Sequence, residues 1–414
     1  MDAETISPSK TPQASLPRGF RWPWTLLALL VLVNLVNYLD RQLIFPLFPY
    51  LKDEFGLTDF RLGLLGTVFI VVHALASLPF GWLADRWSRR RIIGFGVLFW
   101  SGATVLTGLA QSFRMLLISR SLVGVGESAY APAGTAMLSD AFPVSLRARV
   151  QSVFTLGMFF GGIAGMMLSG TLAAKFGWRP AFFIVAVPGM ILAFFCFRIR
   201  EPERRHTARA GGGRVLLANP AFLLTLVSAA LVTFAASAFV TWAVTFAVRY
   251  HGLTVKQASL MLGPVTMGGG LLGVTFGGWL ADKLQSKFPG GRALVIAVGF
   301  LASAPLLYVG IRSETRMTFY VAIALATFFL TWYHGPATAI VHDLAPVELR
   351  AAAFGLYMLF IHLVGNAPAP TVIGALADRT SLRTAMMLPV ATLFLSALGF
   401  LGVGYLIHGR TKKG

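Results

Sequence analysis

Two residues of opposite charge lie inside a long apolar stretch of this sequence, where each of them needs a partner. Arg120 and Glu127 belong to the run R-S-L-V-G-V-G-E-S-A-Y, which ends at Tyr130. On an α-helix their spacing places both on one face, roughly 10 Å apart. A charge at the centre of a bilayer costs at least about 2.5–3.5 kcal/mol, so such residues usually face a polar interior. The pattern predicts a functional site in a water-filled chamber, or an ion pair that only locks two helices together.

A third ionisable group lies in the first apolar stretch, within the run N-Y-L-D-R from Asn37 to Arg41. Helical rise places Asp40 roughly 12 Å, and Arg120 roughly 9 Å, from the outer ends of their spans, so the two side chains can be level. We expect Asp40 and Arg120 to pair reversibly, because a neighbouring arginine favours the ionised carboxylate while desolvation favours the protonated one. Exchange of partners would then move a proton. The forked donors of Arg120 also suit the oxygens of a substrate anion.

Positioning these charges requires membrane-spanning helices, and the composition provides them. The chain has 414 residues, of which 56% are hydrophobic and 12% charged, and its formal net charge is +19. Apolar residues extend over nearly the whole length, which is typical of a polytopic membrane protein and argues against nucleic acid as a partner. Lys and Arg concentrate in the segments on the amino-terminal side of the membrane. We therefore predict an inner or plasma membrane protein with both termini in the cytoplasm.

Twelve apolar segments are each long enough to cross about 30 Å of hydrocarbon as a helix, which predicts an all-α membrane protein. They lie at about 24–48, 61–83, 92–110, 114–139, 150–174, 181–199, 221–248, 259–281, 293–311, 317–342, 351–376 and 385–407. We divide the chain into a disordered cytoplasmic tail at 1–22, a six-helix bundle at 23–199, a cytoplasmic linker at 200–220, a second six-helix bundle at 221–407 and a tail at 408–414.

The two halves are repeats of each other. The run G-W-L-A-D-R at Gly81 to Arg86 returns as G-W-L-A-D-K at Gly278 to Lys283, after the second span of each half. At one constant spacing, Tyr130, Asp140, Pro143 and Arg147 return as Tyr333, Asp343, Pro346 and Arg350. Parallel six-span repeats place the substrate site at their interface.

The repeated loop motif predicts a cytoplasmic gate. Its glycine lets helices approach closely, its aspartate can accept hydrogen bonds from a neighbouring helix amino terminus, and its basic residues favour the cytoplasmic side. The gate residues are Gly81, Asp85, Arg86, Arg89, Asp282 and Lys283. This motif resembles the loop signature of the major facilitator superfamily, and R-S-L-V-G-V-G resembles the arginine and glycine motif of its fourth helix. The resemblance implies twelve helices in two pseudo-symmetric six-helix bundles.

A narrower resemblance rests on N-Y-L-D-R, on G-V-G-E-S-A-Y, and on the run H-L-V-G-N-A-P-A-P-T-V-I-G-A-L-A-D that begins at His362. Together they are similar to the spinster branch of the superfamily, although Asn366 stands where an acidic residue is expected. That branch resembles exporters of sphingosine phosphate and lysophospholipids, so it implies an amphiphilic lipid substrate and functional roles for Asp40, Arg120 and Glu127. N-Y-x-D-R also occurs in facilitators of organic anions such as sugar acids, which remain the alternative substrates.

Polar and aromatic residues on otherwise apolar helices are candidates for lining the substrate site. Apolar walls suit an acyl chain, and a tyrosine or tryptophan can turn a polar edge to a head group. For each residue, ordinary helix packing is the alternative. The candidates are Asn37, Tyr38, Phe69, His73, Tyr130, Thr241, Trp242, Thr331, Trp332, Tyr333, His334, Tyr357, His362 and Asn366.

Other chemistry finds little support in the sequence. It contains neither a G-x-x-x-x-G-K-[ST] phosphate loop nor a G-x-S-x-G motif, and its histidines lack metal-ligand spacing, so we expect no ATP drive, enzymatic activity, cofactor or metal. The glycines Gly157, Gly161, Gly162 and Gly165 resemble an antiporter motif without its proline and predict a helix-packing seam. We predict a monomeric secondary transporter that works by alternating access with proton linkage. A receptor or scaffold without turnover is the alternative of a different class.

Overall fold

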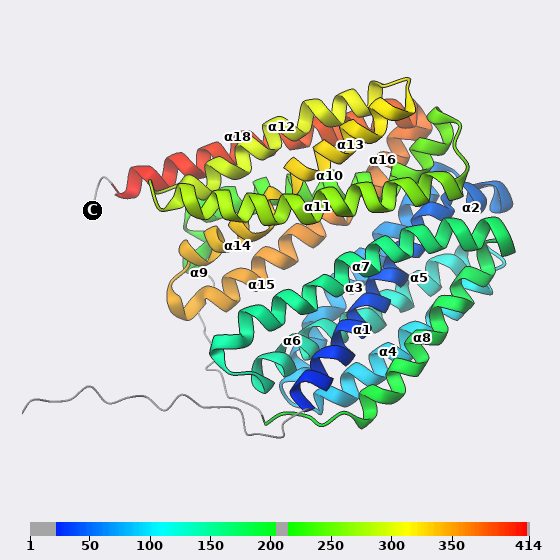
Figure 1. Ribbon diagram of the computed structural model, residues 1–414, viewed down its shortest axis with the longest axis horizontal. Helices are drawn as coiled ribbons and strands as arrows, with labels where there is room; N and C mark the ends of the chain where they lie inside the picture. The colour runs from blue at the N-terminus through cyan, green and yellow to red at the C-terminus, as the bar shows by residue number, and fades with distance from the viewer. Residues whose placement is uncertain (1–21, 204–213, 412–414) are drawn as a thin grey trace, which may run out of the picture.

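The computed structural model describes residues 22–203 and 214–411 (Figure 1). Every regular element in these ranges is a helix, which confirms the predicted all-α class. Eleven helical segments of the described chain are long and apolar enough to cross a membrane. The predicted span at 114–139 is divided into helices of 16 and 12 residues, so neither part reaches that length alone. The predicted tail at 1–22, apart from Trp22, and the middle of the predicted linker at 200–220 lie outside the described ranges.

The helices before the linker pack on one another, with α1 against α7, α4 against α8, and α5 between α3 and α4. Their bounds are α1 Trp22–Leu43, η1 Phe45–Leu47, α2 Phe48–Phe55, α3 Asp59–Ala84, α4 Arg89–Gly108, α5 Phe113–Ser128, α6 Tyr130–Ala141, α7 Val144–Phe176 and α8 Trp178–Arg198. Side-chain caps fix several starts, since Thr58 accepts a hydrogen bond from the Arg61 amide and Ser112 accepts one from the Met115 amide.

The helices after the linker form a second group, in which α18 packs against α10 and α12, and α13 packs against α11 and α12. Their bounds are α9 Arg214–Leu217, α10 Pro220–His251, α11 Val255–Gln285, α12 Gly291–Arg312, α13 Arg316–Leu330, η2 Thr331–Tyr333, α14 His334–Asp343, η3 Val347–Leu349, α15 Arg350–Phe360, η4 Ile361–Asn366, α16 Pro368–Arg379, α17 Leu382–Ala385 and α18 Met387–Thr411. The last helix continues to Thr411, so the first residues of the predicted tail at 408–414 are helical.

Prolines explain where the spans break. Pro132 has no N–H for the carbonyl four residues earlier, and α5 gives way to α6 at Ala129. Pro336 acts in the same way in the second half, where the 3-10 turn η2 separates α13 from α14. Pro368 and Pro370 follow the π-helix η4, in which the regular hydrogen-bond ladder is also interrupted. The fourth, tenth and eleventh predicted spans therefore all contain a break near mid-length.

The predicted glycine seam holds α7 against the backbone of α1. A Cβ atom on Gly157, Gly161 or Gly165 would lie 2.7, 2.2 or 2.4 Å from a backbone carbonyl oxygen of α1. Spaced four residues apart, these glycines form one smooth stripe on the helix, so the two backbones approach closely. This close approach provides a packing reason for the glycines that is independent of any role in antiport.

The two groups of helices meet at one end and diverge at the other. In Figure 1 they lie together near α2 and α16 and separate towards α6, α14 and α15. The most extensive contacts between the groups pair α3 with α16 and α7 with α11. We call the end that carries α2 the joined end, and the end that carries Trp22 and the linker the divergent end. The interface between the two groups is where the repeat predicts the substrate site.

Candidate functional site

Side chains from three helices meet around Arg41 inside the first group. Arg41 of α1 donates to Oε2 of Glu127 on α5 from Nε at 3.3 Å and from Nη2 at 3.1 Å. The same Nη2 lies 3.2 Å from Nε2 of His73 on α3. Glu127 is only 1% exposed, so the ion pair lies where both Coulomb attraction and the desolvation cost are large. Arg41 therefore connects α1, α3 and α5.

Asp40 contacts a different residue. Its Oδ2 accepts a hydrogen bond from the Thr104 hydroxyl of α4, and its Oδ1 has no hydrogen-bond partner within the described structure. Consecutive residues of an α-helix project roughly 100° apart, so Asp40 and Arg41 point to different neighbours. None of the guanidinium nitrogens of Arg120 makes a hydrogen bond to Asp40 in the described structure. The expected pairing of Asp40 with Arg120 is therefore not formed in this conformation. The ion pair at this level is Arg41 with Glu127.

Arg120 is the least satisfied charge of the site. It is 0% exposed, yet none of its three guanidinium nitrogens donates a hydrogen bond to a described residue. Its Cζ lies 4.7 Å from the ring centroid of Phe69, and Asp40 and Glu127 act on it electrostatically. A buried guanidinium without hydrogen bonds carries the desolvation cost of up to five N–H donors. The arrangement suits the binding of an anion.

Predicted lining residues from α1 and α3 surround the charges. The Arg41 Cζ lies 4.9 Å from the ring centroid of Tyr38 and 5.1 Å from that of Phe69, which is therefore shared between both arginines. Asn37, one turn before Arg41, is buried, and its Nδ2 has no hydrogen-bond partner in the described ranges. The structure thus brings four of the predicted residues beside the charges, namely Asn37, Tyr38, Phe69 and His73.

Tyr130 lies deeper in the first group. It is 2% exposed, its hydroxyl donates to the Leu30 carbonyl oxygen at 3.1 Å, and its ring meets Trp100 edge-on at a centroid distance of 6.2 Å. Both the hydroxyl and the ring already have partners. This placement favours the packing alternative for Tyr130.

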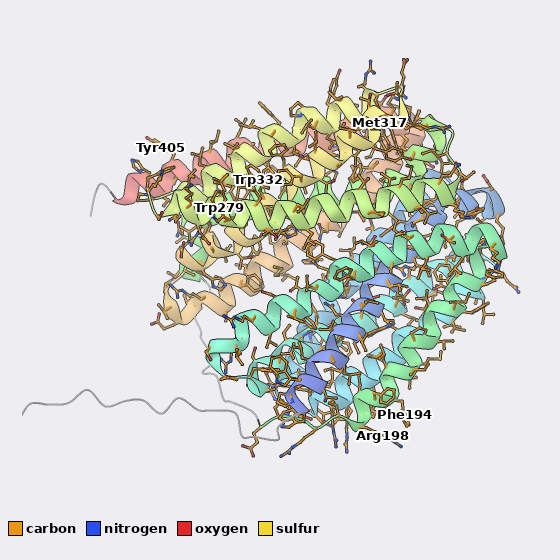
Figure 2. The ribbon with its side chains drawn as sticks, in the orientation of Figure 1. Phe194, Arg198, Trp279, Met317, Trp332 and Tyr405 are labelled. Carbon is orange, nitrogen blue, oxygen red and sulfur yellow. The ribbon has the colours of Figure 1, made fainter. Side chains whose placement is uncertain are left out.

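The candidates of the tenth span lie at the break between α13 and α14. The Thr331 hydroxyl donates to the Gly270 carbonyl oxygen of α11 at 3.1 Å. Trp332, labelled in Figure 2, packs against Phe328 at a ring-centroid distance of 5.8 Å. Tyr333 stacks on His334 at 4.3 Å. The Thr331 contact joins this span to α11, whereas the other two contacts lie within the span itself.

The candidates of the eleventh span lie in and beside the π-helix η4. Tyr357 is 2% exposed and stacks on Phe354, while His362 Nδ1 lies 2.7 Å from the carbonyl oxygen of its own span at Met358. The Asn366 carbonyl oxygen accepts a hydrogen bond from the Ser237 hydroxyl of α10 at 2.9 Å. Single π-turns inside α-helices are frequent at functional sites, because they leave backbone groups outside the regular ladder.

Matching ion pairs lie near the divergent end of each group. Arg89 Nη1 lies 2.5 Å from Asp140 Oδ2, and Arg292 Nη1 lies 2.6 Å from Asp343 Oδ2. The partners are 51 positions apart in both pairs, so the internal repeat extends to this contact. Asp282 also accepts from Arg292, at 3.2 Å. The predicted gate residues Arg89 and Asp282 thus form ion pairs within their own halves.

Of the other predicted gate residues, Gly81 and Lys283 lie in the last turns of α3 and α11, and Asp85 and Arg86 lie on the loop after α3. The Arg86 Cζ lies 3.9 Å from the Trp82 ring, and the Lys283 Nζ lies 4.9 Å from the ring of Trp279, which Figure 2 labels. A Cβ on Gly81 would meet nothing within 4 Å. Asp85 is exposed. The close helix contact expected at Gly81 is therefore not used in this conformation.

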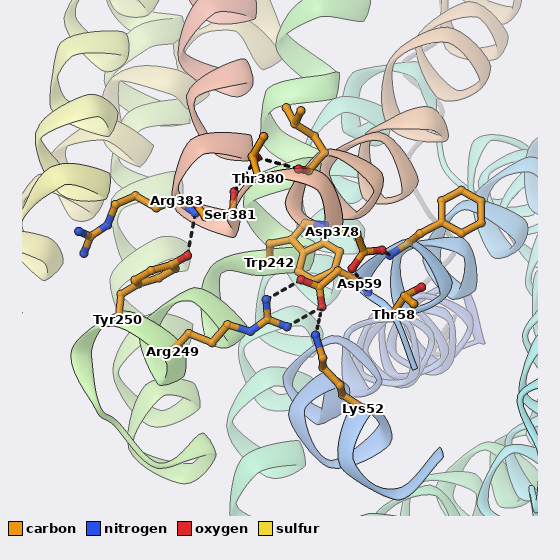
Figure 3. Close-up of polar contacts among 12 residues, drawn as sticks. Lys52, Thr58, Asp59, Trp242, Arg249, Tyr250, Asp378, Thr380, Ser381 and Arg383 are labelled. Carbon is orange, nitrogen blue, oxygen red and sulfur yellow. Dashed lines mark hydrogen bonds and ion pairs between the residues drawn. The ribbon is translucent and has the colours of Figure 1, made fainter. Parts of the chain in front are cut away.

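The joined end is held by four charged residues, which we call the Asp59 cluster: Lys52, Asp59, Arg249 and Asp378. Arg249 of α10 makes a bidentate ion pair with Asp59 of α3, at 2.5 and 2.6 Å, and Lys52 Nζ lies 2.7 Å from Asp59 Oδ1 (Figure 3). In return the Asp378 carboxylate accepts from the backbone amides of Asp59 and Phe60, both at 2.8 Å. Each half therefore supplies a carboxylate to the other.

Close backbone packing accompanies the Asp59 cluster. A Cβ on Gly63 would lie 2.2 Å from the Pro370 carbonyl oxygen, and one on Gly374 would lie 2.3 Å from the Asp59 carbonyl oxygen. The predicted lining residue Trp242 is also found here, where its Nε1 donates to the Pro370 carbonyl oxygen at 3.1 Å. Its neighbour Thr241 is 1% exposed. Trp242 thus contributes to packing at the joined end.

The Asp59 cluster was not predicted, although the sequence contains a signal for it. Gly374 to Arg379 reads G-A-L-A-D-R, a third copy of the G-x-L-A-D-[RK] pattern of the two loops. The aspartate of this copy is Asp378, which caps the start of α3 across the interface. An aspartate that accepts from a neighbouring helix amino terminus is the role proposed for the loop copies, and here it occurs at the opposite end of the molecule.

Comparison with known proteins identifies the family. Residues 30–370 match the family model described as Major Facilitator Superfamily. The chain belongs to this superfamily. The protein spinster of Drosophila melanogaster is 28% identical over 399 residues, which cover 90% of this chain and 65% of that protein. Human protein spinster homolog 1 is 27% identical over 435 residues, which cover 94% of this chain and 82% of that protein.

A solved structure agrees with this assignment. A bacterial homolog of the human lysosomal transporter spinster, in an inward-facing and occupied conformation, superposes with a TM-score of 0.87 at 23% identity, over 94% of this chain and 98% of that one. At this identity the likeness establishes the fold. The chain is therefore a multi-pass membrane protein with the major facilitator fold, and its relatives place it in the spinster branch. The chain covers 65% of the length of the Drosophila protein.

Proposed function

We propose that this facilitator moves an amphiphilic lipid of the lysophospholipid or sphingosine-phosphate kind by alternating access, with proton linkage through Asp40, Arg120 and Glu127. The observation that carries the proposal is Arg120, which is 0% exposed and has no hydrogen bond to a described residue. A phosphate or carboxylate that reaches it would supply the oxygen acceptors that its forked donors lack. The neighbouring aromatic rings of Tyr38 and Phe69 suit the apolar part of the same ligand.

Two unbonded carboxylate oxygens support proton linkage. Oδ1 of Asp40 and Oε1 of Glu127 are both buried and lack hydrogen-bond partners in the described structure. An unbonded, desolvated carboxylate oxygen is a natural place for a proton, while Arg41 holds the charged form of Glu127. When a substrate anion pairs with an arginine, a carboxylate loses electrostatic stabilisation and takes up a proton more readily. Binding and protonation are thereby coupled through shared partners.

The two ends of the molecule support alternating access. The Asp59 cluster joins the halves at one end, while Figure 1 shows the helices diverging towards the other. If Lys and Arg mark the cytoplasmic side, the divergent end faces the cytoplasm and this conformation is inward-facing. Transport would require the Asp59 cluster to separate while the divergent ends approach each other. Both termini would be cytoplasmic, in the inner or plasma membrane.

Ligand-induced stabilisation tests the substrate class. Purified protein is heated with a series of lysophospholipids and, in parallel, with sugar acids, and the midpoint of thermal unfolding is measured. A ligand that binds only the folded protein at a hundredfold excess over its Kd stabilises it by about 2.7 kcal/mol. We expect a rise with the lipids that Arg120→Gln removes. A response to sugar acids alone would refute the lipid as the substrate. It would favour the alternative substrate, a small organic anion, for which a buried arginine is equally suited.

Vectorial flux separates a transporter from a receptor of the same fold. Protein is reconstituted into liposomes and uptake of a labelled lysophospholipid is followed with an inwardly or an outwardly directed proton gradient. Net movement that depends on the direction of the gradient supports the proposal. Saturable binding without movement in either gradient would indicate a receptor or scaffold.

A further inference from the structure

An apolar groove opens on the surface of the first group between α3, α4 and α5, and neither Arg41 nor Glu127 lines it. It has a volume of about 430 Å³ and is lined by Phe80 and Leu83 of α3, Phe95 and Phe99 of α4, and Val125 and Gly126 of α5. Phe95 and Phe99 are 53% and 48% exposed, and on membrane-spanning helices such surfaces face lipid. The groove is thus open to the hydrocarbon of the bilayer.

The residues that line the groove suit one kind of ligand. The groove is walled by carbon and offers almost no polar group, so neither water nor a polar ligand would be held there. Its volume falls within the roughly 300–1,000 Å³ typical of small-molecule sites. Phe95 and Phe99 lie one helical turn apart, so the groove follows the direction of α4. A flexible acyl chain aligned with the membrane normal matches that shape and chemistry.

Cationic groups lie at the divergent end of the groove. Arg91 precedes Phe95 by one turn on the same face of α4, is exposed, and has no partner among the described residues. Arg86 is exposed on the preceding loop, where it lies over the Trp82 ring. The two arginines at the start of α4 are engaged, because Arg89 pairs with Asp140 and Arg90 donates to a backbone carbonyl of the same half. Arg86 and Arg91 thus remain for a ligand.

We propose that this groove holds one acyl chain of an anionic membrane phospholipid, whose phosphate is bound by Arg86 and Arg91. Guanidinium groups beside apolar clefts on the cytoplasmic side bind anionic lipid head groups through charge-assisted hydrogen bonds. The chain would pack against Gly126, directly behind Glu127 on α5. The residues that line the groove are distinct from Asp40, Arg41, Arg120 and Glu127 of the proposed transport site. The lipid site also does not depend on which substrate is transported.

Native mass spectrometry of the delipidated protein titrated with dioleoyl phosphatidylglycerol tests the assignment. The variants are Arg86→Gln with Arg91→Gln, which removes the cations, and Leu98→Trp, which fills the groove from an exposed position. The matched control is Arg198→Gln. Arg198 is exposed at the divergent end of α8, where its guanidinium lies over the Phe194 ring, and it does not line the groove (Figure 2). Thermal unfolding of each variant in the same detergent shows whether it is folded.

We expect the wild type and Arg198→Gln to bind one phosphatidylglycerol with equal affinity. The double arginine variant should bind about 30-fold more weakly, as two lost cation contacts imply. Leu98→Trp should lose this molecule even though both arginines remain. Equal binding by the wild type and the double variant, or an equal loss in Arg198→Gln, would overturn the proposal. Binding of dioleoyl phosphatidylcholine as tight as that of phosphatidylglycerol would refute the role of the arginines.

Discussion

Replacing Asp59 by asparagine tests the contacts that join the two halves. The Asp59 carboxylate accepts from both terminal nitrogens of Arg249 and from Lys52, at 2.5 to 2.7 Å. Asparagine has nearly the same shape but carries no charge. Its side chain has one acceptor oxygen, whereas the carboxylate offers two oxygens to the three cationic donors. The variant therefore weakens the joined end with little change in packing. Asp378 still caps α3, so a partial weakening is expected.

The magnitude follows from the exposure of the partners. The side chain of Asp59 is 4% exposed, while those of Arg249 and Lys52 are 27% and 38% exposed. Loss of one partner of a fully buried pair costs about 3–5 kcal/mol, and an exposed pair contributes about 0–1 kcal/mol. An intermediate cost of about 2 kcal/mol is expected for this half-buried cluster. It would shift the balance between conformations that are joined and open at this end by about 30-fold.

Distances between spin labels measure that shift. Lys175 and Lys256 mark the ends of α7 and α11 at the joined end, and Ser145 and Ser286 mark the opposite ends of the same helices; all four are exposed. The native Cys196 is 1% exposed and should stay unlabelled. In Asp59→Asn, we expect the distance distribution of the first label pair to extend to larger values, and that of the second pair to shorter ones.

Asp53→Asn is the control. Asp53 lies on α2 at the same end, is exposed, forms no ion pair in the described structure, and loses the same charge. It should leave both distance distributions as in the wild type. Distributions in Asp59→Asn that match those of Asp53→Asn would refute the assignment of the Asp59 cluster as the contact that holds this conformation.

Three further predictions follow from other contacts. Asp40→Asn should keep substrate binding but lose the dependence of uptake on the proton gradient, and tracer flux at two external pH values will show whether that dependence persists. Gly161→Leu should abolish folded protein, because its Cβ would lie 2.2 Å from a backbone oxygen of α1, whereas Gly102→Leu, with nothing within 4 Å, should purify normally on size-exclusion chromatography. Arg89→Gln should lower the stability of the folded protein by about 2–3 kcal/mol, because both side chains of its ion pair are at most 10% exposed. Arg292→Gln should lower it by less than about 1 kcal/mol, because the carboxylate partners of Arg292 are at least 52% exposed. Equal losses of stability in thermal unfolding would contradict this reasoning.

Much of the fold was predictable because it depends on one-dimensional patterns. Apolar length gave the spans, and the constant spacing between Asp140 and Asp343 indicated the repeat that the matching ion pairs now display. The divided spans depend on prolines that the sequence also shows. Helix breaks such as the one at Ala129 nevertheless require the observed geometry, because a proline can kink a membrane helix without ending it.

The partners of the charges were less predictable. Helical rise gives the depth of a residue but does not fix which way its helix faces, so Asp40 was expected at Arg120 while Arg41 reaches Glu127 instead. The Asp59 cluster lies at helix ends, where a charged residue needs no special explanation. Recognition that Asp378 belongs to a third copy of the loop motif would have pointed to it. The contact it makes between the halves depends on tertiary packing, which the pattern alone does not supply.

Uptake of a labelled lysophospholipid by proteoliposomes containing Arg120→Gln tests the central claim most directly. Arg114→Gln is the matched control, because Arg114 lies on the same helix, carries the same charge and is exposed. A buried guanidinium that binds the head group by charge-assisted hydrogen bonds contributes about 1.5–3 kcal/mol, so uptake at limiting substrate should fall at least about tenfold in Arg120→Gln and stay unchanged in Arg114→Gln. Wild-type uptake by folded Arg120→Gln protein would show that the transported anion does not bind this arginine.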